Sequence, residues 1–249
     1  MNWTALSVEL DLLLNLQSSP LAITFSDEAP VGVNAFDSPM PEPTADGRTG
    51  RVPAGCVFWI EGVARTFTTE PADHGNCSVG SLTHGLKTLE EIAGNSDVAA
   101  LLESGWVTMD VVPQIPTVGK RPRFITYGPL AETPIDPDVV FLRLNPKQAM
   151  MLSDALPELR FEGKPQCHII PIAKEQNEIA TSVGCMLSRV RTGMSNNEMS
   201  CAIPAGRLGE VVERLRTHAA ADNAVAAYAS RDAQRFAMHK DKTARDFRS

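Results

Sequence analysis

Short apolar runs bounded by turn-forming residues recur along most of this chain, and they limit it to folds built around a β-sheet. The runs are rich in β-branched and aromatic residues, a composition typical of strands. They predict strands at residues 21–25, 56–60, 65–69, 124–130, 138–144, 167–173, 178–185 and 199–205. The runs at 56–60 (CVFWI) and 65–69 (RTFTT) flank Glu61-Gly62 and together predict a β-hairpin.

Helical patterns lie between and around these runs. Residues 4–16 carry leucines at helical spacing, and shorter helices are expected at about 87–93 and 96–104. Asn145-Pro146 predicts a helix start, because Asn can cap exposed amide groups and Pro fits the first helical position. The residues from 207 to 247 are expected to be largely helical, with a break near 221–223.

The alternation of strands and helices predicts an α/β or α+β fold: a mixed sheet with helices packed on it and a helical C-terminal tail. We expect residues 1–220 to form a single α/β domain with a cysteine-lined site, and residues 221–249 to form a C-terminal helix. The stretch from 27 to 53 has little periodicity and is expected to be a long surface loop.

Composition narrows the classes of partner. Of the 249 residues, 43% are hydrophobic and 21% charged, which is the ordinary globular range, and the formal net charge is -7. This charge provides no attraction to nucleic acid or to anionic membranes. The first residues carry Glu9 and Asp11 within an apolar stretch, unlike a secretory signal. We therefore expect a cytoplasmic protein that binds a small-molecule substrate and neither nucleic acid nor a membrane; its apolar strands would allow a homodimer without requiring one.

The five cysteines are the main candidates for chemistry. An odd number without a secretory signal argues against a disulfide framework and leaves reduced thiols or metal ligands. Glycines accompany three of them: Gly55 precedes Cys56, Gly184 precedes Cys185, and Gly80 follows Cys77. Because glycine permits close backbone approach, these glycines are candidate cofactor-binding positions. The shared cysteine-after-glycine feature is only weak evidence for an internal duplication.

The spacing of the cysteines does not by itself identify a metal. There is no C-x-x-C pair of the kind that closed zinc sites use and no ferredoxin-like run. Any single cysteine, taken alone, is better explained as a small buried hydrophobic residue than as a ligand.

Histidines and arginines near the cysteines are candidate catalytic residues. His74 and His84 flank Cys77, and His84 would share a helical face with Cys77; either could ligate, move protons or lower the pKa of the thiol, or simply form hydrogen bonds in a polar loop. At strand spacing, Arg189 and Arg191 would point the same way and could hold a carboxylate, or they could line a solvated strand edge.

Several motifs together resemble a known family. They are VPAGCVFW, DHGNCSVGSLTHG, YGPLAETPIDPDVVFLRLNPKQAMML and SVGCMLSRVRTGMSNNEMSCAIP. In this order, from about Pro20 to Leu215, they resemble the domain of unknown function 169 family. The resemblance implies that four cysteines and one histidine belong to the family pattern: Cys56, Cys77, Cys167, Cys185 and His74. It supplies no activity, and Cys201 falls where an ordinary apolar residue is expected.

With the resemblance, a joint metal site becomes the leading hypothesis. Four thiolates from separate segments suit an iron-sulfur cluster, a 4Fe-4S cluster being one form, and zinc is less favoured because paired short spacings are missing. Cys56, Cys77 and Cys185 would hold the cluster, with Cys167 as a fourth ligand or a nearby thiol. We expect an enzyme acting on a small anionic molecule by non-redox lyase or hydrolase chemistry at an open iron.

Two other functions stay open at this point. One is a metal-free enzyme with Cys77 as nucleophile and His74 or His84 as base. The other is a non-catalytic accessory protein that binds a cofactor.

Overall fold

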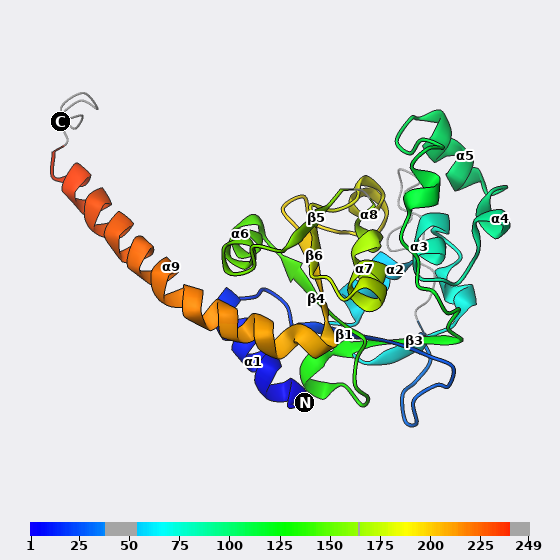
Figure 1. Cartoon of the computed structure of the whole chain (residues 1–249), viewed down its shortest axis with the longest axis horizontal. Coiled ribbons are helices and arrows are strands. Elements are labelled where there is room, and N and C mark those ends of the chain that lie inside the picture. Colours follow the sequence, from blue (N-terminus) through cyan, green and yellow to red (C-terminus); the bar gives the residue numbers. More distant parts are fainter. Residues whose placement is uncertain (38–53, 164, 240–249) are drawn as a thin grey trace.

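A computed structural model describes residues 1–37, 54–163 and 165–239, apart from the side chain of Arg191. Within these residues, seven strands form one sheet in the order β2-β3-β1-β4-β7-β6-β5, with helices packed around it (Figure 1). All neighbouring strands are antiparallel except β5 and β6, which are parallel. The fold is therefore the mixed sheet with packed helices that the sequence predicts.

The strands and helices have the following bounds. The strands are β1 Leu21–Ser26, β2 Phe67–Thr69, β3 Phe124–Pro129, β4 Val139–Leu144, β5 Arg160–Glu162, β6 Ala180–Ser182 and β7 Met199–Pro204. The α-helices are α1 Trp3–Leu14, α2 Gly55–Glu61, α3 Ser78–Thr83, α4 Leu89–Ile92, α5 Ser96–Glu103, α6 Pro146–Ala155, α7 Ile169–Gln176, α8 Met186–Arg191 and α9 Leu208–Ala237. Short 3-10 turns are η1 Pro71–His74, η2 Val112–Gln114, η3 Leu130–Glu132, η4 Gln166–His168 and η5 Ala205–Arg207.

The sheet separates two hydrophobic cores. Along β4, Val140 and Leu142 face a core shared with α1, α6 and α9, whereas Val139 and Phe141 face a second core shared with α2 and α7. This alternation is the period of two that a strand imposes. The second core is the aromatic one, and three cysteines of the sequence analysis pack in or against it: Cys56, Cys77 and Cys167. The face of the sheet that carries α2 and α7 is thus the one on which a cysteine site can form.

The predicted strand at 56–60 and the hairpin with 65–69 are wrong. Residues Gly55–Glu61 form helix α2, and only Phe67–Thr69 of the second run is a strand, paired with β3. The helix buries Val57, Phe58 and Trp59 against the sheet. Aromatic and β-branched content reports burial as much as strand geometry, and tertiary packing decided the conformation here.

The predicted strand at 167–173 is also wrong. These residues form the turn η4 and the start of helix α7, where Ile169, Ile170 and Ile172 are buried. Pro171 lies in the first turn of α7, where a missing amide hydrogen costs no helical hydrogen bond. A continuous apolar run suits a buried helix as well as a buried strand.

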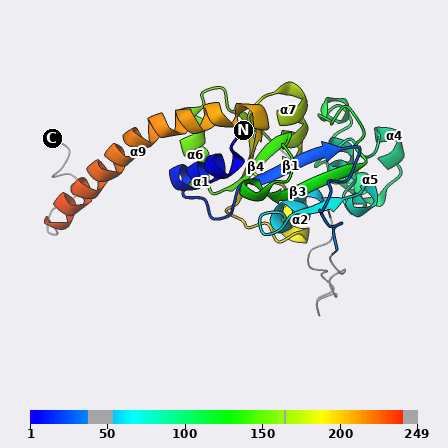
Figure 2. The same cartoon turned by 90° about the horizontal axis from the view of Figure 1, so that it is seen from below.

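Helix α9 is continuous through residues 221–223, so the predicted break there is wrong. Its first turns are buried through Leu208, Val211, Val212 and Leu215, whereas its second half is exposed and extends away from the sheet (Figures 1 and 2). Residues 221–237 therefore belong to the same helix as the part that packs on the sheet. Among the described helices, none has the length and apolar character needed to cross a membrane.

The helix start at Asn145-Pro146 is confirmed and gives a stability prediction. The Asn145 side chain accepts a hydrogen bond from the Gln148 amide at 3.0 Å, and the Gln148 side chain accepts one from the Asn145 amide at 2.7 Å. We expect Asn145→Ala to lower the free energy of unfolding by about 1 kcal/mol, because the cap is lost. Urea denaturation would measure this loss, and Asn196→Ala, at an exposed turn position, serves as the control. Equal stability of the two variants would contradict the capping role.

Candidate functional site

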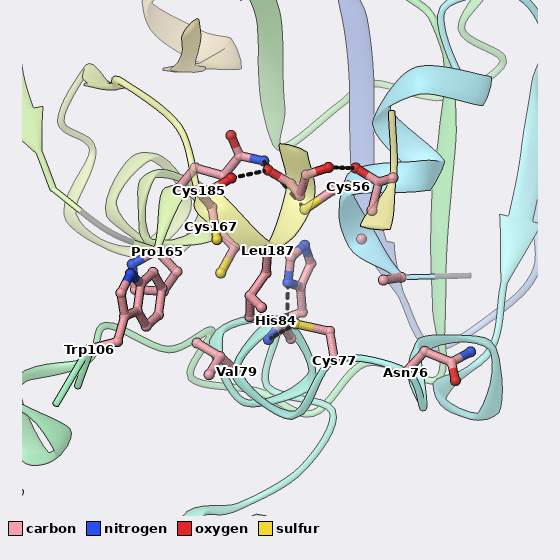
Figure 3. A pocket seen from close by; sticks show the side chains of 16 residues that line it. Cys56, Asn76, Cys77, Val79, His84, Trp106, Pro165, Cys167, Cys185 and Leu187 are labelled. Atoms are coloured by element: carbon pink, nitrogen blue, oxygen red, sulfur yellow. Dashed lines mark hydrogen bonds between the residues drawn. The ribbon is translucent and has the colours of Figure 1, made fainter. Parts of the chain in front are cut away.

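All four cysteines that the sequence singles out line one pocket, on the face of the sheet that carries α2 and α7 (Figure 3). The pocket has a cavity volume of about 40 Å³, which exceeds the space that one water molecule needs. Its lining also contains Gly55, Gly80 and His84 from the sequence analysis. The fold thus brings together candidate residues that lie far apart in the sequence.

Four separate elements position the thiols. Cys56 lies in the first turn of α2, and Cys167 lies in the turn η4 that leads into α7. Cys77 and Cys185 occupy the N-cap positions of α3 and α8, with extended backbones at φ -148° and φ -125°. Cys201 lies apart from them, in β7, fully buried in the other core.

Burial governs the protonation of two of the thiols. Burial raises the pKa of the Cys56 thiol far above its ordinary value, and the nearby Cys77 and Cys185 thiols raise it further. Burial likewise raises the pKa of Cys167, with added repulsion from Cys77, Cys56 and Cys185. In the protein alone these two thiols are therefore protonated at neutral pH, and each responds to the charge of the other cysteines in the pocket.

Two of the sulfur atoms accept hydrogen bonds from N–H groups. The Gly80 amide donates to Cys77 Sγ at 3.3 Å, and the Gln166 side-chain amide donates to Cys56 Sγ at 3.3 Å. Gln166 is itself buried and also donates to Ser188 Oγ at 3.0 Å. Hydrogen bonds of this kind stabilise negative charge on sulfur and tune metal-bound thiolates.

His84 is the one histidine on the pocket wall among the described lining residues. Its Nδ1 lies 2.8 Å from the Gly80 carbonyl oxygen, and because a carbonyl can only accept, Nδ1 carries the hydrogen. Burial lowers the pKa of His84 to about 4, so the ring is neutral and Nε2 keeps its lone pair. Nε2 is buried and has no hydrogen-bond partner. A buried acceptor is thus presented at the pocket.

Gly55 makes room for this ring. A Cβ at position 55 would lie 3.3 Å from His84 Cε1 and 3.6 Å from Nε2, a tighter contact than side chains usually make. The absence of a side chain at position 55 therefore leaves the His84 ring in place without a close contact.

His74 lies behind the pocket rather than on its wall. It is buried, its Nε2 lies 3.0 Å from Thr69 Oγ1, and its ring packs edge-on against Phe58. The rings of His74 and His84 are 5.8 Å apart at their centroids. Burial and the neighbouring His84 lower the pKa of His74 well below its ordinary value. His74 therefore supports the wall on which His84 stands.

The strand alternation predicted for Arg189 and Arg191 is wrong, because residues Met186–Arg191 form helix α8. Residues two apart on a helix do not face the same way. Arg189 donates to the carbonyl oxygens of Val183 at 2.7 Å and Glu198 at 2.8 Å, which ties α8 to the loop before β7. The side chain of Arg191 lies outside the described residues.

Gly184 serves this arginine contact. Its φ is +107°, a conformation that favours glycine, and a Cβ there would overlap the Arg189 guanidinium. The glycine before Cys185 thus makes room for Arg189.

Sequence reasoning missed several residues of the wall. Gln166, Trp106, Asn76 and Thr192 all line the pocket. Gln166 directly precedes Cys167, so its position beside a candidate ligand was a usable signal. Thr192 ends the helix that begins at Cys185, so it too lies close to a candidate ligand in the sequence. Nothing local marks Trp106, which only the fold brings to the pocket.

The wall offers four cysteine thiols as potential ligands but no preformed single-ion site among the described residues. Among the described residues, no group of three or more Cys, His, Asp or Glu side chains is arranged to hold a metal ion. A tetrahedral zinc site would need sulfur atoms about 3.8 Å apart, given Zn–S distances of ~2.3 Å. The described lining residues include no Lys or Arg, so no cation competes for the thiolates.

Comparison with known proteins adds the family. The model of the domain of unknown function 169 family, described as an uncharacterised ArCR, matches residues 9–214. The chain belongs to this family. Among the curated proteins and the solved structures, the searches returned no match to it. The family's matched region includes all four pocket cysteines and both candidate histidines.

The glycine at position 184 gives a testable consequence. Gly184→Ala should cost about 1–2 kcal/mol of unfolding free energy for the left-handed backbone, and ~1–3 kcal/mol more when Arg189 is displaced from its two carbonyls. Gly193→Ala is the matched control, because Gly193 also has positive φ (+77°) but open space around its Cα. Urea unfolding of both variants measures the difference, and equal losses would contradict the role of Arg189.

The buried His74 gives a pH dependence of stability. Its pKa is lowered in the folded state, so below about pH 6.5 the unfolded chain binds a proton that the folded chain does not. Stability should therefore fall as pH decreases from 7 to 5, by at most ~1.4 kcal/mol per pH unit from this residue. His74→Gln should reduce that slope. Unfolding curves at several pH values measure it, and an unchanged slope would argue against a neutral buried His74.

Proposed function

We propose that this protein is an iron-sulfur protein and that the cluster is held by the thiolates of the pocket. The observation that carries the proposal is the convergence of Cys56, Cys77, Cys167 and Cys185 from four elements on one small pocket. Thiolates are the ligands that iron-sulfur clusters use. The N–H groups of Gly80 and Gln166 already point at two of the sulfur atoms, as they would around bound thiolates.

The protonation of Cys56 and Cys167 supports a cationic occupant. Burial and mutual repulsion keep Cys56 and Cys167 protonated in the protein alone. A metal centre would offset that repulsion, and each thiol that becomes a ligand would release its proton to solvent. Metal uptake should therefore strengthen as pH rises.

The same protonation weakens the metal-free alternative for two of the thiols. Nucleophilic cysteines react as thiolates and sit where their pKa is lowered. Burial does the opposite at Cys56 and Cys167. Cys77, the nucleophile of that hypothesis, lines the same pocket as His84, a candidate base.

A small molecule bound beside the cluster would meet His84. The lone pair on Nε2 can accept a proton from such a molecule or a hydrogen bond from it. The expectation of an anionic molecule rested on Arg189 and Arg191, and Arg189 is engaged by backbone carbonyls. The proposal is therefore limited to a small molecule of unspecified charge.

The number of thiolates decides the class of chemistry. Three thiolates would leave one iron open as a Lewis acid for hydration, elimination or removal of a heteroatom, the lyase or hydrolase type expected from the sequence. Four thiolates would leave no open iron. Cys167 is the residue that separates these two cases.

Metal analysis tests the proposal. Wild-type protein, Cys77→Ala and Cys201→Ala would be purified without oxygen and assayed for iron, sulfide, zinc and visible absorption. We expect iron and sulfide in the wild type and in Cys201→Ala, which changes a buried thiol outside the pocket, and at least ~10-fold less in Cys77→Ala.

Other outcomes would overturn the proposal. Zinc without iron would indicate a different metal. A metal-free wild type in which iodoacetamide labels Cys77 alone would favour the nucleophile hypothesis instead.

A further inference from the structure

The strand order of the sheet has a twofold pattern. The edge strand β5 is left out of this pattern. The order β2-β3-β1 on one side is matched, in reverse, by β4-β7-β6 on the other, and β1 and β4 are antiparallel at the centre. In chain order, β1, β2 and β3 of the first half correspond to β4, β6 and β7 of the second. Each half therefore has its third strand in the middle, antiparallel to its first and second strands.

The residue register fixes this correspondence. Leu21 pairs with Pro129 in the first half and Val139 pairs with Pro204 in the second, so Leu21 corresponds to Val139. At the centre Leu21 pairs with Phe141 and Ile23 pairs with Val139. A twofold rotation exchanges these two pairs.

The axis of that rotation passes through the central strand pair. Ala22 pairs with Val140, midway between the two exchanged pairs, so the rotation exchanges Ala22 and Val140 with each other. This pair marks where the two halves meet.

Local details repeat after the third strand of each half. A proline ends each strand and a 3-10 turn follows, η3 in one half and η5 in the other. The Leu130 amide donates to the Pro20 carbonyl oxygen at 2.8 Å, and the Ala205 amide donates to the Asp138 carbonyl oxygen at 3.0 Å. In both cases the acceptor is the residue just before the first strand of the same half.

The cysteines follow the same pattern. In each half a helical segment between the first and second strands carries one cysteine, Cys56 or Cys167. In each half the second strand is followed by a six-residue helix whose N-cap is the other cysteine, Cys77 for α3 and Cys185 for α8. Cys56 thus corresponds to Cys167, and Cys77 to Cys185.

The C-terminal ends of the two short helices also match. His84 is the C-cap of α3, and its Nδ1 lies 2.8 Å from the Gly80 carbonyl oxygen. Thr192 is the C-cap of α8, and its Oγ1 donates to the Ser188 carbonyl oxygen at 2.6 Å. Both residues line the pocket.

The rest of the pocket wall completes the correspondence. Every lining residue except Asn76 and Trp106 has a counterpart in the other half that also lines the pocket. Besides the cysteines and C-caps, the pairs are Ala54 with Pro165, Gly55 with Gln166, Val79 with Leu187, and Gly80 with Ser188. The pocket therefore lies on the axis that relates the two halves.

We infer that the chain consists of two copies of one structural unit and that the cluster site is a two-half site in which Cys56, Cys77, Cys167 and Cys185 are all ligands, two from each half. This assignment rests on the proposed function. It makes Cys167 a ligand equal to Cys56, so the cluster has no open iron. Two-iron and four-iron clusters with four cysteine ligands both have a twofold axis and suit such a site.

The two halves differ on the side where a small molecule would bind. Only the first half inserts a long segment after its short helix, containing α4, α5 and η2, and this segment brings Trp106 to the pocket. Gly55 has no side chain beside His84, whereas its counterpart Gln166 carries a side chain that hydrogen-bonds to Ser188. The ligand set is symmetric, whereas the wall around it differs between the two halves.

Single cysteine variants test the assignment. Wild type, Cys56→Ala, Cys167→Ala, Cys77→Ala, Cys185→Ala and the control Cys201→Ala would be reconstituted anaerobically with ferrous iron and sulfide. We expect the four pocket variants to lose iron and visible absorption at least ~10-fold, with each corresponding pair matched within about twofold, while the control matches wild type.

A second variant at position 167 keeps the test decisive if Cys167→Ala fails to fold. Cys167→Ser is close in size and should shift the visible and paramagnetic resonance spectra if position 167 ligates. Iron in the wild type together with unchanged iron and spectra in the Cys167 variants would overturn the assignment but not the proposed function. A wild type that takes up no iron would overturn the proposed function, and the assignment with it.

Discussion

The antiparallel pairing of β1 with β4 is the interaction on which the rest of the structure depends. It joins two sets of strands that are otherwise separate. The paired residues Ala22 and Val140 lie at the centre of this junction, where the two halves meet. Each half alone would place two cysteines on one face of a small sheet. Joined, they place four thiols around one pocket, above a core that contains Phe58, Tyr127 and Phe141.

Burial gives this pocket its chemistry. The surrounding protein reduces the solvation of Cys56, Cys167 and His84, so the charged forms of these groups are disfavoured. The result is that two of the pocket thiols, Cys56 and Cys167, are neutral, and one histidine lone pair lies in the same pocket. Under the proposed function, a metal centre would take the place of the protons on these thiols.

Much of the fold and of the candidate site follows from local patterns. The cap at Asn145, the strands at 124–129 and 139–144 and the class of fold were predictable because each depends on residues close in sequence. The segments at 56–60 and 167–173 were not, because a short buried apolar run has the same composition in a helix as in a strand. These two segments are corresponding elements of the two halves, and both are helical rather than extended.

The duplication shows the limit of sequence reasoning most clearly. The shared glycine-cysteine pairs at 55–56 and 184–185 suggested a correspondence, but the strand register relates Cys56 to Cys167 and Cys77 to Cys185. Gly55 makes room for His84 and Gly184 makes room for Arg189, so the likeness of the two dipeptides has different causes. Register is a property of paired strands and is not visible in either strand alone.

The sequence by itself determined which residues can do chemistry here, since thiols and imidazoles are fixed by residue type, and it determined which segments prefer to be buried. Only the tertiary structure decided which of them meet. Cys56, Cys77, Cys167 and Cys185 lie far apart along the chain, and their meeting depends on the central strand pair and on helices α2, α3, α7 and α8. The physical reason is that burial and helix-strand choice for short segments are settled by long-range packing, which local propensity is too weak to oppose.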